Sequence, residues 1–302
     1  MTLQELRYIV ALADSGHFGK AAEACFVTQS TLSTQLRKLE DGLGLILFDR
    51  SLKRVTPTPM GREVLAAARN ILAEAERIRA IAGHNRDPMA RTIHLGIIPT
   101  LGPYYLPGAL ALVRKRHPSL RTLLREETTP QIVAHLLEGD LDAALLALPV
   151  VDEKIKFAPL FREPFYAALP ADHRLAARKT LQASDLEGEK LLLLDEGHCL
   201  RDQALDFCNT RASTLREEVR ATSLETLRQM VGMGLGITLL PALAVNAGSR
   251  SSNKGVVCRP FKRPSPERAI ALIWRKHTPF PETFQQLAAT LKAGLPVEVK
   301  PA

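Results

Sequence analysis

The distribution of proline is the feature that most constrains the fold of this 302-residue chain. No proline occurs in residues 1–56, two occur at Pro57 and Pro59, and none follows until Pro88. Because proline interrupts helix interiors, the N-terminal part is predicted to consist of two helical blocks joined by a turn. Beyond Pro88, proline recurs throughout the chain except between residues 171 and 240.

The composition indicates a folded chain of two or three domains without a membrane span. Hydrophobic residues make up 46% and charged residues 24% of the sequence, which is ordinary for a globular protein. The longest apolar stretches, such as Ala143–Val151, are shorter than the ~18 residues that a membrane helix needs. Acidic Glu5 near the N-terminus, with no small-residue cleavage site after it, argues against a secretory signal. We therefore expect a cytoplasmic protein with no membrane partner, in which four cysteines form no disulfide scaffold.

The first block divides into three short helices. The predicted ranges are Leu3–Ser15, Phe18–Cys25 and Thr28–Leu39, and Gly16 separates the first two. Thr28 offers a side-chain oxygen as the N-cap of the third helix. Two short helices joined by a tight turn, in the segment FGKAAEACFVTQSTLSTQLRKLE, are typical of a helix-turn-helix.

The third helix has an apolar and a polar face. Leu32, Leu36 and Leu39 share one side, whereas the polar residues lie mostly elsewhere and suit the major groove of double-stranded DNA. The candidate base or groove contacts are Gln29, Ser30, Thr31, Ser33 and Thr34. A short hairpin is expected within LGLILFDRSLKRVTPT and supplies further cations. The candidate phosphate contacts are Arg37, Arg50, Lys53 and Arg54. A generic three-helix bundle with a solvated polar face is the alternative.

The net charge of +8 gives only weak support for an anionic partner. Residues 1–91 carry 13 basic and 10 acidic side chains, and residues 92–250 carry 18 and 19. Residues 251–302 carry 9 and 3, so the excess is largest far from the helix-turn-helix. A solvated basic tail explains this distribution equally well.

The second block, Met60–Gly83, has a heptad pattern. Its apolar residues recur at alternating spacings of four and three, at Val64, Ala68, Ile71, Ala75, Ile78 and Ala82. Such a seam favours a coiled-coil helix that forms a homodimer, and a helix packed on its own domain is the alternative. A dimer suits a helix-turn-helix, because two recognition helices must reach successive major grooves ~34 Å apart.

From residue 92, short β-branched or leucine-rich runs alternate with helical ones. The expected strands are Thr92–Ile98, Leu120–Glu126, Leu141–Leu148, Phe165–Leu169, Lys190–Asp195, Ile237–Leu240, Gly255–Val257 and Ala269–Trp274. The expected helices are Tyr104–Arg116, Pro130–Glu138, Leu200–Phe207, Leu224–Gly232 and Pro281–Ala293. This alternation predicts parallel sheets covered on both faces. The segment is too long for one small sheet, so we expect two α/β lobes with a cleft between them.

Two parts of the sequence resemble the LysR-type transcriptional regulators. The N-terminal LRYIV…FGKAAEACFVTQSTLSTQLRKLEDGLG…LFDR…TP…G matches their winged helix-turn-helix signature almost throughout. The segment SLETLRQMV…GLGITLLP, residues 223–241, is similar to their effector domain. The resemblance covers nearly the whole chain. It implies an α/β fold class with an all-α-dominated winged helix-turn-helix domain and a two-lobed regulatory domain like a periplasmic binding protein.

The resemblance also implies domain boundaries and partners. The winged helix-turn-helix domain covers residues 1–59, the dimerising linker helix residues 60–87, and the regulatory domain residues 88–302. Lobe I of the regulatory domain covers about 88–162 and 268–302, and lobe II about 163–267. The implied protein is not an enzyme but a transcription activator. It binds double-stranded DNA as a dimer of dimers, a homotetramer, with RNA polymerase as a further candidate partner.

Within the family, the segment LLLLDEGHCLRDQALDFC, residues 191–208, resembles the redox segment of the hydrogen peroxide sensors. Both cysteines, Cys199 and Cys208, occur together with His198 and Arg201. Family members that bind small metabolites are not expected to carry this pair. The resemblance implies a sensor of hydrogen peroxide that forms a reversible Cys199–Cys208 disulfide and controls antioxidant genes. A dithiol reductant would reset it.

Reaction with peroxide requires a thiolate, whereas an ordinary thiol with a pKa near 8.5 is mostly protonated at neutral pH. Cys199 is predicted where the strand Lys190–Asp195 gives way to a helix, so the positive end of the helix dipole faces it. His198 and Arg201 are close in sequence and can add positive charge or hydrogen-bond donors.

Other candidate residues of the peroxide site come from the resemblance. It places Arg268 near the reactive thiol, and it places Thr100 and Thr129 around peroxide and a water molecule. Both threonines follow predicted strands, at the edge where open α/β sheets bind ligands. For each threonine, a turn hydroxyl bonded to the backbone is the alternative.

The spacing of the two cysteines predicts a conformational switch. If Leu200–Phe207 is helical, nine residues separate the cysteines by roughly 13 Å along the helix axis, whereas a disulfide needs Cα atoms within about 7 Å. Oxidation of Cys199 to a sulfenic acid and its capture by Cys208 therefore require the helix to unwind. Two buried cysteines that never meet are the alternative.

The other cysteines and the histidines indicate neither a metal site nor a cofactor. Cys25 and Cys258 are expected to be packing residues. The histidines are scattered, and none pairs with a cysteine at the spacing of metal ligands.

Two alternatives to the peroxide sensor remain open. One is a LysR-type regulator that responds to a small-molecule effector bound between the lobes, with incidental cysteines. The other is a thiol peroxidase that happens to bind DNA. Catalytic turnover distinguishes the second alternative, because an enzyme recycles rapidly with its reductant and a sensor does not.

Overall fold

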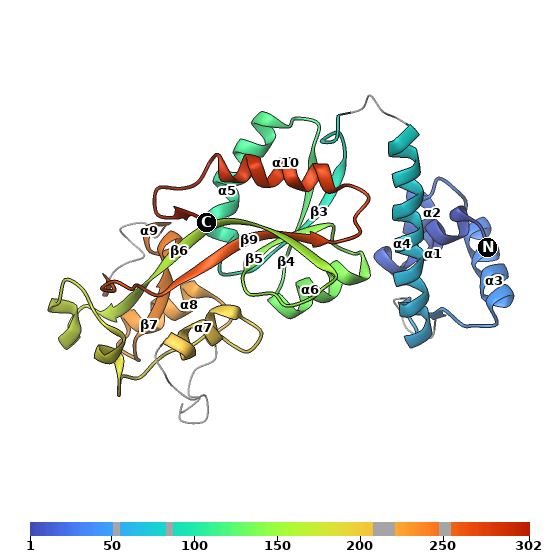
Figure 1. The fold of residues 1–302 in the computed structure, drawn as a ribbon. Helices are drawn as coiled ribbons and strands as arrows, with labels where there is room; N and C mark the ends of the chain where they lie inside the picture. The colour runs from blue at the N-terminus through green and yellow to red at the C-terminus, as the bar shows by residue number, and fades with distance from the viewer. Residues whose placement is uncertain (51–54, 83–86, 208–220, 248–254) are drawn as a thin grey trace. The chain divides into compact units, whose positions relative to one another are not determined.

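The computed structural model of the chain describes residues 1–50, 55–82, 87–207, 221–247 and 255–302. The chain forms two compact units, one made mainly of Met1–Asp87 and the other containing most of residues 88–302 (Figure 1). In the described part of the chain, no helix is both long enough and apolar enough to cross a membrane.

The N-terminal unit combines helices with a small antiparallel wing. Its elements are α1 (Leu3–Ser15), α2 (Phe18–Ala24), α3 (Gln29–Leu43), β1 (Phe48–Asp49), β2 (Thr56–Pro57) and α4 (Pro59–Ala82). Thr2 and Glu5 form a capping box that starts α1. The Thr28 hydroxyl accepts a hydrogen bond from the Thr31 amide at 3.2 Å, so α3 begins directly after its predicted N-cap. It extends past the predicted end to Leu43.

One hydrophobic core holds the N-terminal unit together. Leu32, Leu36 and Leu39 of α3 are buried in it, together with Ile9 and Leu12 of α1. The polar face of α3 is thereby left outward, because a helix with a single apolar stripe turns that stripe to the core.

The regulatory unit is built on a mixed sheet with the strand order β10-β6-β9-β5-β3-β4. Its strands are β3 (Thr92–Ile97), β4 (Arg121–Glu126), β5 (Ala143–Ala147), β6 (Ile155–Pro170), β9 (Glu267–Arg275) and β10 (Lys300–Pro301). Helices α5 (Gly102–Arg116), α6 (Thr129–Glu138) and α10 (Pro281–Lys292) cover this sheet. Figure 1 shows α5 and α10 side by side on one face and α6 on the other.

Strand β6 continues from this sheet into a second lobe, so the predicted two-lobed fold is confirmed. There it pairs with β7 (Thr238–Pro241) and β8 (Val256–Pro260). The lobe also contains α7 (Cys199–Phe207), α8 (Leu224–Gly232), α9 (Ala242–Ala247) and the short 3-10 helices Arg174–Ala177 and Ala183–Leu186. Two clusters of buried side chains, one on each face of its strands, form the core of this lobe.

Two expectations about this unit are wrong, and a third gives a strand that is too short. The sheet is only partly parallel, because β6 and β9 pair with their neighbours in antiparallel fashion. The predicted strand Lys190–Asp195 makes only isolated bridges, through Leu191 and Leu194. The strand predicted at Phe165–Leu169 is the second half of the longer β6. Its first half contains Pro159 and Pro164, residues that discourage a strand prediction.

Candidate functional site

Three segments of the regulatory unit bring side chains together around Cys199. Thr100 lies in the turn between β3 and α5, Thr129 is the first residue of α6, and Cys199 is the first residue of α7. Gly197 has a φ of 86°, a conformation that glycine adopts without strain, and it turns the chain into α7. These segments enclose a pocket lined by Ile98, Pro99, Thr100, Thr128, Thr129, Gly197, His198 and Cys199.

The pocket around Cys199 is very small. No water-sized sphere fits between its lining atoms, whereas sites for larger organic ligands hold about 300–1,000 Å³. Any ligand would therefore have to displace the lining side chains, and a metabolite would have to displace them further than a molecule of two heavy atoms would.

Arg268 lies buried behind this pocket, at 1% exposure. Its Nη1 donates to the Thr100 hydroxyl at 2.8 Å and its Nη2 to the Thr100 carbonyl at 3.0 Å. Its Nε donates to the Glu163 carboxylate at 2.8 Å, and the second Glu163 oxygen accepts from the Leu243 amide at 2.9 Å. Because every one of these charged groups is hydrogen-bonded, the network can hold a cation in the protein interior.

Glu163 is a functional candidate that the sequence prediction missed. It lies directly opposite Arg268 in the antiparallel ladder between β6 and β9. Its partner could not be inferred, because the half of β6 that carries Glu163 was not predicted as a strand. An ion pair between residues on neighbouring strands can be predicted only when the strand register is known.

Burial raises the pKa of the Cys199 thiol. Arg268, the Thr129 hydroxyl and the Leu200 amide act in the opposite direction, and the charge of Asp202 adds to the rise. The helix N-terminus was expected to lower the pKa of Cys199, but the effect of burial is larger and raises it. The physical reason is that the thiol is withdrawn from water, which disfavours the thiolate.

His198 and Arg201 were expected to add positive charge or hydrogen-bond donors near the thiol. His198 lines the pocket, but burial lowers the pKa of its imidazole, with Asp195 opposing, so the ring is neutral at pH 7. Arg201 donates to the Leu194 carbonyl at 3.1 Å. The charge of Arg268, which the resemblance places near the thiol, lowers the pKa of Cys199.

The Thr129 hydroxyl is buried and has no well-oriented hydrogen-bond partner in the described structure. It is nevertheless close enough to Cys199 to lower the pKa of the thiol. Buried hydroxyls are almost always hydrogen-bonded, so an unpaired one that faces a pocket marks a position for a ligand.

Cys208, Lys53 and Arg54 lie outside the described residues. Cys25 packs against the core of the N-terminal unit and Cys258 against a core of the second lobe. Burial raises the pKa of both thiols.

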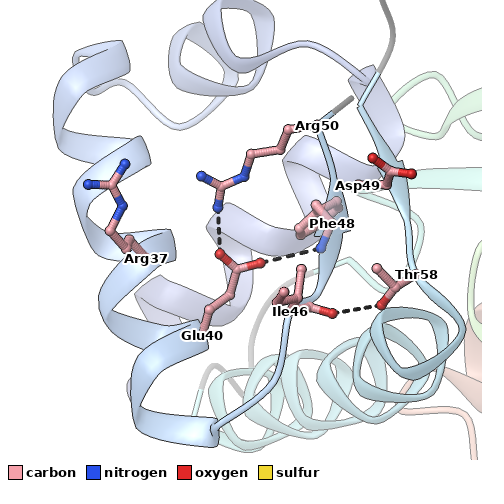
Figure 2. A pocket seen from close by; sticks show the side chains of 7 residues that line it. All are labelled: Arg37, Glu40, Ile46, Phe48, Asp49, Arg50 and Thr58. Carbon is pink, nitrogen blue, oxygen red and sulfur yellow. Dashed lines mark hydrogen bonds and ion pairs between the residues drawn. The ribbon is translucent and has the colours of Figure 1, made fainter. Parts of the chain in front are cut away.

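The outward face of α3 carries the candidate DNA contacts. Gln29, Ser30, Thr31, Thr34 and Arg37 are exposed, and Ser33 is half-buried. A groove separates α3 from the wing (Figure 2), and Arg37 and Arg50 both line it. The groove leaves these cations accessible to a phosphate backbone.

Arg50 is oriented by Glu40 of α3 and by the Phe18 ring of α2. Its Nη2 lies 2.5 Å from Oε2 of the buried Glu40, and its guanidinium lies 5.6 Å from the centre of the Phe18 ring. Oε1 of Glu40 accepts hydrogen bonds from the amides of Leu47 at 2.8 Å and Phe48 at 3.3 Å. Glu40 thus connects α3, the wing and Arg50, as Figure 2 shows.

Apolar heptad residues of α4 are buried in the first part of the helix and exposed in the later part. Ala68 of the seam is buried with Leu65 in the core of the N-terminal unit. Ile71 and Ile78, further along the same seam, are 41% and 65% exposed. The first part of the helix therefore packs on its own domain, and the later part presents apolar side chains to solvent.

Comparisons with known proteins agree with this architecture. Residues 3–62 match the bacterial regulatory helix-turn-helix protein, lysR family, and residues 86–296 match the LysR substrate binding domain. The DNA-binding transcriptional dual regulator OxyR of Escherichia coli is 43% identical over 295 residues, which cover 98% of this chain and 96% of that protein.

Two solved structures are similar along nearly the whole chain. A full-length OxyR from Pseudomonas aeruginosa, with a cysteine replaced by aspartate, has a TM-score of 0.86 at 40% identity and covers 97% of this chain and 95% of its own. An OxyR mutant of Corynebacterium glutamicum with H₂O₂ bound has a TM-score of 0.67 at 36% identity, covering 97% and 92%. The chain therefore belongs to the LysR family of transcriptional regulators, and within it to the OxyR group of hydrogen peroxide-inducible genes activators.

Proposed function

We propose that this regulator senses hydrogen peroxide through reversible formation of a Cys199–Cys208 disulfide and thereby controls antioxidant genes. The observation that carries the proposal is the small pocket in which Cys199 meets Thr100, Thr129 and His198, with Arg268 behind it. Its size favours peroxide over a metabolite. The H₂O₂-bound relative supports the same ligand.

The first chemical step oxidises Cys199. Its sulfur attacks one oxygen of peroxide, a sulfur–oxygen bond forms, and the oxygen–oxygen bond breaks. The thiol proton ends on the departing oxygen, which leaves as water. The hydroxyls of Thr100 and Thr129, with the nearby charge of Arg268, stabilise the negative charge that develops on that oxygen. Because burial raises the pKa of the thiol, positioned donors supply the reactivity rather than a large fraction of thiolate.

The second step forms the disulfide. The Cys208 thiol attacks the sulfenic sulfur of Cys199, and the sulfenic oxygen departs as water. A dithiol reductant later returns two electrons and two protons and becomes a disulfide itself, which restores both thiols.

Helix α7 makes this step a conformational switch. The helix spans Cys199–Phe207, which separates its terminal Cα atoms by about 12 Å. Cys208 follows Phe207 directly, and consecutive Cα atoms are about 3.8 Å apart. The two cysteine Cα atoms are therefore at least about 8 Å apart while α7 is intact, beyond the limit of about 7 Å for a disulfide. Oxidation thus unwinds part of α7 and alters the surface of the second lobe.

The response reaches DNA through a homodimer whose linker helices are the α4 segments, with exposed Ile71 and Ile78 at the contact. Two dimers form a homotetramer, and RNA polymerase is the further partner in transcription. The outward residues of α3 contact base edges, while Arg37, Arg50, Lys53 and Arg54 contact phosphates.

The test measures DNA binding by the full-length protein before and after peroxide. The probe is a duplex that the reduced protein selects from a random-sequence pool. We expect peroxide to change the length of DNA protected from nuclease by the wild type and by Cys258→Ser, a matched control with another half-buried thiol, but not by Cys199→Ser. A response that persists in Cys199→Ser would favour an effector between the lobes. Rapid peroxide consumption with excess dithiothreitol would favour a thiol peroxidase.

A further inference from the structure

Phe26, in the turn between α2 and α3, has an unusual backbone conformation. Its φ is 56°, and every other described residue with a positive φ is a glycine. Within the same unit, Gly16 and Gly44 occupy the left-handed positions that end α1 and α3. The left-handed region is strained for a bulky side chain, so Phe26 departs from the way this chain builds its other turns.

No packing compensates for this strain. The Phe26 side chain is 96% exposed, although aromatic rings usually contribute to stability by burying most of their surface. The turn itself is held by backbone hydrogen bonds from the Phe26 amide to the Glu23 carbonyl at 3.1 Å and from the Val27 amide to the Ala22 carbonyl at 3.0 Å. These bonds do not require an aromatic side chain. A strained backbone conformation that no packing of the side chain offsets is typical of residues at functional sites.

The position of Phe26 beside the start of α3 indicates that its contact would be with DNA. Two residues later, Thr28 caps α3, and the exposed side chains of Gln29 and Ser30 follow on its first turn. In a helix-turn-helix this end of the recognition helix enters the major groove. Phe26 therefore adds an exposed apolar side chain close to the exposed start of α3. The apolar group that the major groove offers is the 5-methyl group of thymine.

We infer that Phe26 is a DNA contact that packs its ring against a thymine methyl group and so contributes to sequence preference. This inference rests on the proposed DNA binding by α3. It adds an apolar contact to the polar contacts of that helix.

The test uses the full-length protein and the duplex that the wild type selects from a random-sequence pool. Binding is measured for the wild type, Phe26→Asn and Phe26→Gly, and for Val151→Asn, a control that removes an equally exposed apolar side chain from the regulatory unit. Each thymine of the duplex is also replaced in turn by uracil, which lacks the methyl group. We expect both Phe26 variants to bind about tenfold more weakly. We also expect one uracil position in each half-site to weaken the wild type but not the variants.

Folding is followed in the same samples. Asparagine and glycine tolerate the left-handed region, so both variants should have a Tm at least equal to that of the wild type. A lower Tm in both would show that the ring serves folding and would overturn the inference. Unchanged affinity, or equal sensitivity to uracil in wild type and variants, would overturn it as well. If the wild type selects no sequence at all, the proposed DNA binding fails instead.

Discussion

Glu163 and Arg268 face each other across the ladder between β6 and β9, and both side chains are fully withdrawn from solvent. The carboxylate fixes the guanidinium, and the guanidinium in turn holds both the hydroxyl and the carbonyl of Thr100. A strand pairing thereby places the cation that stabilises the Cys199 thiolate. In the account proposed above, the reactivity of the thiol depends on this buried ion pair, although the pair makes no direct contact with peroxide.

Glu163→Gln is expected to lower the pKa of Cys199. The amide keeps the shape of the side chain but removes the negative charge that offsets Arg268, so the cation acts more strongly on the thiolate. The pH dependence of Cys199 alkylation, followed by mass spectrometry of its peptide, measures this shift. A pKa that is unchanged or higher would contradict the assigned role of the pair.

Arg268→Met is expected to raise the pKa of Cys199 and to destabilise the fold by about 3–5 kcal/mol, because Glu163 is left buried without its partner. The double variant Arg268→Met/Glu163→Gln is the matched control. It should recover much of the stability in urea unfolding, since no buried charge remains, but the raised pKa should persist. Recovery of the wild-type pKa in the double variant would show that Arg268 does not act on the thiol.

The rate of Cys199 oxidation by peroxide should keep rising at pH values so high that an ordinary thiol is already fully ionised. Burial raises the pKa of Cys199 above its ordinary value, so the thiolate fraction is still increasing there. Stopped-flow measurement of the second-order rate constant between pH 6 and pH 10 checks this. Thr129→Val removes a neighbouring hydroxyl that lowers the pKa of the thiol, and it should move the profile further to high pH. A plateau reached near neutral pH would contradict the description of a buried thiol.

Glu40→Ala is expected to destabilise the N-terminal unit by about 2–6 kcal/mol. The substitution leaves the amides of Leu47 and Phe48 without their acceptor, and unpaired buried donors cost about 1–3 kcal/mol each. Urea unfolding measures the loss, and Glu40→Gln, which keeps one acceptor oxygen, should lose less. Equal losses in the two variants would show that the charge of Glu40 matters more than its hydrogen bonds.

Local patterns in the sequence predicted much of the fold. The heptad, the proline gaps and the polar face of α3 are properties of short segments, and α1 and α8 have the predicted bounds. Features that depend on pairing between strands far apart in the sequence were not predicted. The antiparallel entry of β9 between β5 and β6 joins strands far apart in the sequence, and no local pattern encodes it.

The candidate site shows the same division. The cysteine and its flanking residues could be identified from a motif. The net direction of the thiol pKa could not, because it depends on how far tertiary packing removes the sulfur from water. For the same reason, Arg201 was expected to act on the thiol from its closeness in sequence. Arg268, which lies far away in sequence and was placed near the thiol only by the family resemblance, is the cation that lowers its pKa.

The most direct test of the central claim is mass spectrometry of thiol-blocked tryptic peptides, before and after stoichiometric hydrogen peroxide. The account predicts a Cys199–Cys208 linkage that forms within seconds, disappears on treatment with a dithiol and is absent from Cys199→Ser. Cys25 and Cys258 should remain free under the same conditions. If both Cys199 and Cys208 remain as free thiols in the wild type, the peroxide switch is contradicted.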